Sequence, residues 1–330
     1  MRKVSMLLLL LVVAVFAVTP AFANGEPGTI ADIVVASATG EMPEFTILLT
    51  AVQAADPGIL EALSNPDIEL TVFAPTDAAF GALIEALGEE AFNEIVADQA
   101  LLTSILQYHV VAGAVFSEDV LALLEANDGM FKVPTLNGQF IDIYEDMGEI
   151  FVDDARLVLE MVDIEASNGV IHVIDAVILP ETATIAEIVT EAAAAEMGEF
   201  TTLLAAVMAA DPAVLEALSD PDASLTVFAP TDAAFAALGE DTINAVVSDQ
   251  ELVTNILLYH VIAGRISSVQ LVEMLTDAMG ELEVETLQGS TVVFTTTDEG
   301  IFINDAQIIM TDIDAGNGVI HVIDAVILPE

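Results

Sequence analysis

All four histidines of this 330-residue chain lie inside blocks of sequence that occur twice, and they are the first candidates for chemistry: His109, His172, His260 and His321. Two imidazoles per copy, at matching positions, suit proton transfer or metal binding. A zinc site needs three or four converging ligands, and the chain has no cysteine. Carboxylates would have to complete such a site, so we predict no metal site and no cofactor.

His172 and His321 lie in runs that are apolar at nearly every position, which predicts strands buried on both faces. A buried histidine needs a hydrogen-bond partner. Asp77 and Asp232 follow the proline of an earlier repeated block, and they are candidates either for those partners or for helix caps. We therefore expect structural roles for all four residues.

No motif of an activated nucleophile or of a phosphate or calcium loop is present, neither G-x-S-x-G, H-E-x-x-H and G-x-x-x-x-G-K-[ST] nor an EF-hand. The 54 acidic residues would allow many carboxylate pairs on paper, so no pair identifies a glycosidase before its geometry is known. We predict that the protein is not an enzyme. Its acidic loops, at residues 153–154 and 220–222, predict only weak and unspecific cation binding.

These candidates belong to a repeat with a period of about 150 residues. Residues 71–80 recur unchanged at 226–235, and residues 168–181 recur unchanged at 317–330. The copies differ by small deletions after Phe235 and before the last block. A period of this size predicts a separate core for each copy. The expected organisation is a signal peptide at 1–23, a first domain at 24–181 and a second domain at 182–330.

The first half of each copy has helical patterns, and the second half has strand patterns. Residues 45–52 have the apolar spacing of a helix, Asp56-Pro57 begins another, and Thr76 or Asp77 caps a third after a short strand at 70–73. Further strands are expected in the second half, at 139–144, 150–152, 156–162 and 170–179. Helices followed by strands predict an α+β fold.

The N-terminus has the pattern of a signal peptide, with Arg2 and Lys3 before an apolar run and Ala21-Phe22-Ala23 as the cleavage site. Cleavage leaves three basic residues against 54 acidic ones, a net charge of −51. Such a surface repels nucleic acid and anionic lipid and attracts cations or basic partners, and high salt screens its self-repulsion. We expect a secreted protein, extracellular or periplasmic, with no stable membrane insertion after cleavage.

The blocks T-V-F-A-P-T-D-A-A-F and N-G-V-I-H-V-I-D-A-V-I-L-P, with a Tyr-His pair between them, resemble the motifs of the fasciclin domain family. The resemblance covers both copies, from about Thr29 to Glu330. It implies two tandem fasciclin-like domains, each a β-sandwich or wedge with flanking helices in its N-terminal half. Many family members serve in cell adhesion or matrix contact, and some bind small apolar molecules, including carotenoids.

The same resemblance makes the Tyr-His pairs candidates for binding a protein, because the pair is implicated in receptor binding in some family members. The residues concerned are Tyr108, His109, Tyr259 and His260. The alternative is that tyrosine and histidine close the end of a helix and pack against the sheet.

Two functions follow as hypotheses. The first is a non-catalytic adhesion or matrix-interaction module, in which two copies favour avidity for a protein, cell-surface or matrix partner. The alternative is a soluble carrier of an apolar small ligand such as a carotenoid or lipid. A solvent-open apolar pocket would favour the carrier.

Overall fold

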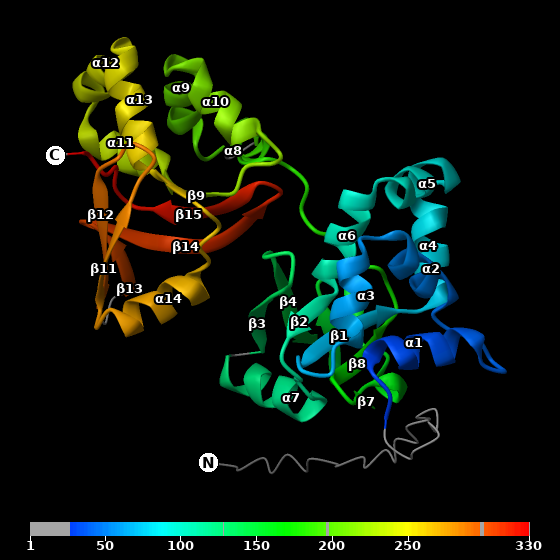
Figure 1. Cartoon of the computed structure of the whole chain (residues 1–330). Helices are drawn as coiled ribbons and strands as arrows, with labels where there is room; N and C mark the ends of the chain where they lie inside the picture. Colours follow the sequence, from blue (N-terminus) through cyan, green and yellow to red (C-terminus); the bar gives the residue numbers. More distant parts are fainter. Residues whose placement is uncertain (1–26, 128, 196–197, 298–299, 330) are drawn as a thin grey trace, which may run out of the picture. The chain divides into compact units, whose positions relative to one another are not determined.

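The computed structural model describes residues 27–329 apart from 128, 196–197 and 298–299, so the predicted signal peptide lies outside the described residues. The chain divides into two compact units, of which one ends at Leu179 and the next begins at Pro180. Both units have helices first and mostly strands afterwards, which confirms the predicted α+β class (Figure 1).

The first unit begins with helices and ends in strands. Its helices are α1 (Ile30–Thr39), α2 (Thr46–Ala54), α3 (Pro57–Ser64), α4 (Asp77–Leu87), α5 (Glu89–Ala97), α6 (Gln99–Tyr108), α7 (Ser117–Ala126) and the 3-10 helix η1 (Leu159–Met161). Its strands are β1 (Leu70–Pro75), β2 (Val110–Ala112), β3 (Met130–Pro134), β4 (Phe140–Asp146), β5 (Glu149–Val152), β6 (Ala155–Arg156), β7 (Ile164–Ala166) and β8 (Gly169–Ile174).

The second unit repeats this order. Its helices are α8 (Ile185–Ala194), α9 (Thr201–Ala209), α10 (Pro212–Ser219), α11 (Asp232–Leu238), α12 (Glu240–Ser248), α13 (Gln250–Tyr259) and α14 (Ser268–Asp277). Its strands are β9 (Leu225–Pro230), β10 (Val261–Ala263), β11 (Glu281–Glu285), β12 (Thr291–Thr297), β13 (Gly300–Ile303), β14 (Ala306–Ala315) and β15 (Gly318–Ile323).

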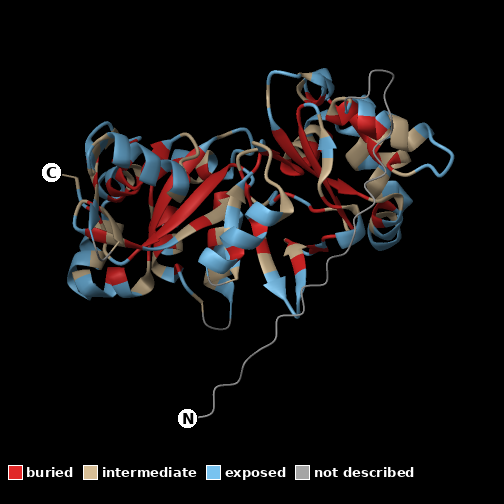
Figure 2. Cartoon of the chain, turned by 90° about the horizontal axis from the view of Figure 1, so that it is seen from below, coloured by how far each residue is buried: buried red, intermediate tan, exposed pale blue. Residues whose placement is uncertain are grey.

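A mixed sheet lies at the centre of each unit. In the first unit its order is β2-β1-β8-β7, with β1 and β8 parallel and the outer pairs antiparallel. Every residue of β1 and β8 is buried, as the apolar runs predict. The second unit has the same parallel pair in β9 and β15. Figure 2 shows these strands in red, as the buried centre of each unit.

Two apolar cores lie on opposite faces of this sheet. On one face, Val72 and Ala74 of β1 pack with helices α1, α2, α3 and α6. On the other face, Phe73 packs with α7 and with the antiparallel sheet β3-β4-β5-β6. The alternation of side chains along the strand sends neighbouring residues into different cores. The first unit therefore has a helical layer, a mixed sheet and a second sheet, whereas in the second unit the strands form one sheet of order β10-β9-β15-β14-β13-β12-β11.

The asparagine of each Asn-Gly motif ties the helical layer to the sheet. Asn168 Oδ1 accepts a hydrogen bond from Ile30 N at 2.8 Å, and its Nδ2 donates to Leu63 O and Asn65 O, both at 3.0 Å. One buried amide thus satisfies backbone groups at the start of α1 and at the end of α3. Asn317 makes the same contacts in the second unit.

The strand predictions for the end of the first copy are partly wrong. The strand expected at 156–162 is only the two residues of β6, and η1 follows it. The last strand stops at Ile174 instead of 179, because Asp175 turns to accept a hydrogen bond from Arg156 N at 2.8 Å. Helices α7 and α14 were not predicted, since they interrupt the half that is otherwise strands.

Within the described residues, no single helix has the length and hydropathy to cross a membrane. Helices α2 and α3 are long and apolar enough only when they are taken together, and the chain bends by 119° between them.

Candidate functional site

The Tyr-His pairs end two corresponding helices. His109 directly follows α6, with its Nδ1 2.7 Å from Ile105 O and its own carbonyl accepting from Phe73 N at 2.9 Å. His260 follows α13 with its Nδ1 2.7 Å from Ile256 O. Burial lowers the pKa of both imidazoles to about 4, against a smaller rise from these carbonyls. Both rings are therefore neutral at pH 7, with Nδ1–H as the donor.

The second ring nitrogen differs between the units. His260 Nε2 accepts a hydrogen bond from Ile327 N at 3.2 Å, which ties the segment after β15 to α13. His109 Nε2 is buried without a hydrogen-bond partner among the residues described. The imidazole of His260 thus holds a backbone segment in the second unit, whereas the imidazole of His109 has a hydrogen-bond partner at only one of its two nitrogens.

The tyrosine hydroxyls connect α6 and α13 to the antiparallel strands. Tyr108 Oη lies 2.9 Å from Phe140 O and 2.8 Å from Asp153 Oδ2. Burial raises the pKa of Asp153, and the charges of Asp142 and Asp154 add to the rise, against hydrogen bonds from Asp142 N and Tyr108. The equivalent hydroxyl contacts in the second unit join Tyr259 to Thr291 and Asn304.

The four side chains of the pairs are buried, with exposed fractions of 6% for Tyr108, 3% for His109, 4% for Tyr259 and 3% for His260. A partner at the surface of a closed unit has almost no atom of them to touch, which argues against direct side-chain contact. Their arrangement matches the alternative, in which the pair closes a helix and packs against the sheets. Partner binding near the pairs stays a prediction.

His172 of β8 holds two loop segments through its two ring nitrogens. Its Nε2 donates to Val115 O at 2.8 Å, and its Nδ1 accepts from Asp163 N at 3.3 Å. Burial lowers the pKa of His172, so the neutral ring satisfies both contacts. Asp163 in turn accepts hydrogen bonds from the backbone and side chain of Ser117, at the start of α7. The equivalents in the second unit are His321, Ile266, Asp312 and Ser268.

Asp77 and Asp232 are not the partners of these histidines, so that alternative is wrong. Asp77 accepts from Thr46 Oγ1 at 2.7 Å and from Ile47 N at 3.0 Å. It caps the start of α2 across 30 residues of sequence, because Phe45 before that helix has a φ of 65° and no side-chain cap of its own. Asp232 does the same for α9.

The described residues contain no group of three or more histidine, cysteine or acidic side chains placed to hold a metal ion. Every histidine ring nitrogen in the described residues except His109 Nε2 lies within hydrogen-bond distance of a backbone group. The arrangement around the repeated motifs therefore serves to join helices to sheets.

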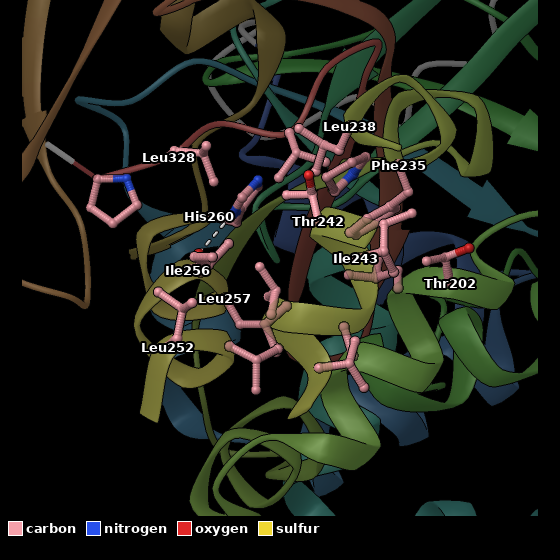
Figure 3. A pocket seen from close by; sticks show the side chains of 18 residues that line it. Thr202, Phe235, Leu238, Thr242, Ile243, Leu252, Ile256, Leu257, His260 and Leu328 are labelled. Carbon is pink, nitrogen blue, oxygen red and sulfur yellow. Dashed lines mark hydrogen bonds between the residues drawn. The ribbon is translucent and has the colours of Figure 1, made fainter. Parts of the chain in front are cut away.

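The second unit also contains an apolar cavity of about 240 Å³ beside its Tyr-His pair, which we call the apolar cavity. Helices α11, α12 and α13, the start of α9 and residues 326–329 form its walls. Figure 3 shows His260 in the wall between Leu328 and the side chains of Phe235 and Thr242. Apart from Thr202, Thr242 and His260, its lining side chains are hydrocarbon.

Two local differences shape this wall. Helix α4 of the first unit spans 11 residues, whereas α11 spans 7, so the second unit lacks one helical turn here. In the next helix, Ile243 occupies the position that corresponds to Phe92, and Phe92 packs against the core of the first unit. A shorter helix and a smaller side chain leave space at this corner. The deletion after Phe235 was the signal in the sequence.

A second cavity of about 590 Å³ shares Val326 and Leu328 with the apolar cavity. Its lining is more polar and includes Tyr259 and Asn304. The tyrosine and the histidine of one pair thus line two neighbouring cavities, and both cavities use the same C-terminal segment as a wall.

The fold and the repeated buried motifs define a protein of two tandem α+β domains. A family model described as the fasciclin domain matches residues 43–180 and 198–329. The chain therefore belongs to the fasciclin domain family, as the sequence resemblance predicts.

Relatives in bacteria and animals share these domains. The Synechocystis protein sll1483 is 43% identical over 132 residues, which cover 39% of this chain and 67% of that protein. Transforming growth factor-beta-induced protein ig-h3 of Sus scrofa is 30% identical over 274 residues, which cover 81% of this chain. This chain spans only 36% of the length of that animal protein.

A solved FAS1 domain pair from the insect cell adhesion molecule Fasciclin I aligns with a TM-score of 0.39 and 19% identity. The alignment covers 86% of this chain and 97% of the other.

Proposed function

We propose that the protein is an exported, non-catalytic adhesion or matrix-interaction protein that binds a protein or cell-surface component through its two fasciclin domains. The observation that carries the proposal is family membership over both halves of the chain. Two copies in one chain make the second contact effectively intramolecular and so raise avidity. Both ring nitrogens of His172, His260 and His321 lie within hydrogen-bond distance of backbone groups, which supports structural roles for these three residues.

The negative charge of the chain indicates which kind of surface its partner should have. A net charge of −49 for the whole chain attracts basic patches and repels anionic surfaces. The contact is therefore electrostatic in part, and it weakens as salt screens exposed charges.

Binding of the fluorescently labelled mature chain to its producing cells tests the proposal. We expect saturable binding that falls with added salt and exceeds that of an unrelated protein of equal net charge. Binding no stronger than that of this control would contradict the proposal. The double variant Tyr108→Phe, Tyr259→Phe removes only the two hydroxyls. Because these are buried, the folded variant should bind as the wild type does, and its loss of binding would restore the pairs as contact residues.

A further inference from the structure

We propose that the apolar cavity of the second unit is a binding site for one small, neutral, largely hydrocarbon molecule. The inference is independent of the adhesion role, since it rests on the volume, lining and opening of the cavity.

The volume sets the size of the ligand. A cavity of about 150 Å³ lined by aliphatic and aromatic side chains takes benzene, whereas drug-sized ligands occupy pockets of about 300–1,000 Å³. The apolar cavity, at about 240 Å³, lies between these sizes. It suits a body of roughly ten to seventeen non-hydrogen atoms, such as two or three fused or linked rings. A carotenoid or a diacyl lipid exceeds this volume, so the cavity would not enclose either one whole.

The lining sets the chemistry of the ligand. None of the described side chains that line the cavity is charged at pH 7, because the low pKa of His260 keeps its ring neutral. An ionised ligand would lose its hydration without gaining a counter-charge. Anionic ligands would also meet the negative field of the whole chain. Both ring nitrogens of His260 already have backbone partners. The hydroxyls of Thr202 and Thr242 are therefore the lining groups that could form a hydrogen bond with a hydroxyl of the ligand.

The opening of the cavity is apolar as well. Leu252 and Leu328, with exposed fractions of 42% and 50%, belong to its lining, and Figure 3 shows them toward the same side of the pocket. Exposed leucines at the rim of an apolar cavity mark an entrance that a hydrocarbon molecule can cross without meeting charge. A bound ligand would cover these rim side chains, which contributes to its affinity.

The corresponding place in the first unit provides the contrast. There Phe92 packs against the core of the first unit, whereas the smaller Ile243 occupies the corresponding position of the second unit, after the shorter helix α11. We therefore expect no equivalent of this site at the corresponding corner of the first unit.

The test uses the full mature chain and N-phenyl-1-naphthylamine, a neutral two-part aromatic probe whose fluorescence rises in apolar surroundings. We expect one probe to bind in the apolar cavity of the second unit. Ile243→Phe, which introduces the residue found in the first unit, should weaken binding at least tenfold. Ile243→Val, which leaves the cavity open, should bind as the wild type does. Equal binding by the wild type and Ile243→Phe would overturn the proposal.

A second measurement does not depend on any variant. Nuclear Overhauser contacts from the probe to the methyl groups of Ile243, Val253 and Leu257 are expected in the wild-type chain. Contacts confined to methyl groups of the first unit, or no saturable binding, would overturn the proposal. Since adhesion does not involve the cavity, Ile243→Phe should still bind cells, so a failure of adhesion and a failure of this site are separate results.

Discussion

Asp153 and Asn304 occupy equivalent positions in the two units, and the difference between them is one of charge. Asp153 accepts from Asp142 N at 2.8 Å and lies beside the Tyr108 hydroxyl. Asn304 accepts from Val293 N at 2.9 Å, but its amide also donates to the Tyr259 hydroxyl at 3.1 Å. The amide satisfies the same turn without a half-buried charge, and asparagine tolerates the positive φ of both positions.

Asp153→Asn should therefore stabilise the first unit at pH 7, by about 1 kcal/mol. The pKa of Asp153 is raised in the folded state, so its favourable contribution is complete below its unfolded pKa and is lost as pH rises through the folded pKa. The gain from the substitution should shrink toward pH 4. Urea unfolding with hydrogen exchange resolved by unit measures it. The mirror variant Asn304→Asp should destabilise the second unit at pH 7, and a gain there would contradict this explanation.

Asp232 is the opposite case, a carboxylate that the fold stabilises in its charged form. Burial raises its pKa, but hydrogen bonds from Thr201 and Thr202 outweigh burial and the net pKa is lowered. Its contribution is therefore present above its unfolded pKa and is lost as pH falls through the lower folded pKa. Asp232→Ala should cost about 1 kcal/mol at pH 7, as the loss of a helix cap does. Thermal unfolding that shows the same loss at pH 7 and pH 2 would contradict the charged-cap explanation.

At the scale of elements, the parallel strand pairs depend on a close approach that only glycine permits. A Cβ atom on Gly169, where φ is 145°, would lie 1.9 Å from Leu70 O of the neighbouring strand. Gly318 meets Leu225 O at 2.2 Å in the same way. The Asn-Gly motif therefore combines an amide that joins two helices with a glycine that lets β8 and β1 meet.

Gly169→Ala should destabilise the first unit by on the order of 3 kcal/mol or more, because backbone on both sides must move. Gly81→Ala is the matched control. It lies inside α4 with no described atom within 4 Å of an added Cβ, and the second unit already has Ala236 there. This control should gain up to about 1 kcal/mol. Calorimetry that ranks the two variants in the reverse order would refute the close-approach explanation.

The sequence allowed the fold to be predicted wherever a pattern was local. The helix starts at Pro57 and Asp77 and the buried strands after Leu70 and Gly169 follow from caps and apolar runs. The partners of Asn168 and Asp77 could not be predicted, since they lie more than 100 and about 30 residues away. The only sign of the apolar cavity in the sequence was the deletion after Phe235. A cavity depends on how helices pack, and no local pattern encodes that packing.

The whole molecule carries its charge on the outside of two apolar units. The cores keep their buried motif residues almost identical between the units, while the differences in length lie at α4 and α11 and just before the last repeated block. There the first unit has two more residues and forms η1, whereas the second has the continuous strand β14 with two irregularities in its pairing. The two units therefore share their buried motif residues, and they differ at the surface and in the region of α4 and α11.

A surface of this charge makes stability depend on salt. With −49 on 330 residues, self-repulsion opposes the compact state, and it acts mainly between exposed carboxylates that ions screen. The described ion pairs, such as those of Arg156 with Glu149 and Asp175, neutralise few of the 54 acids. We therefore expect the melting temperature to rise by several degrees between dilute buffer and about 1 M salt, which corresponds to about 1–2 kcal/mol.

Sodium chloride and potassium chloride at equal ionic strength should have equal effects, because screening does not distinguish the cations. Sucrose at an osmolality that matches the salt is the control for general exclusion effects. A larger effect of one cation at millimolar concentration would show specific binding at the acidic loops instead. A melting temperature that is unchanged between dilute buffer and molar salt would contradict the prediction that self-repulsion among the carboxylates lowers stability.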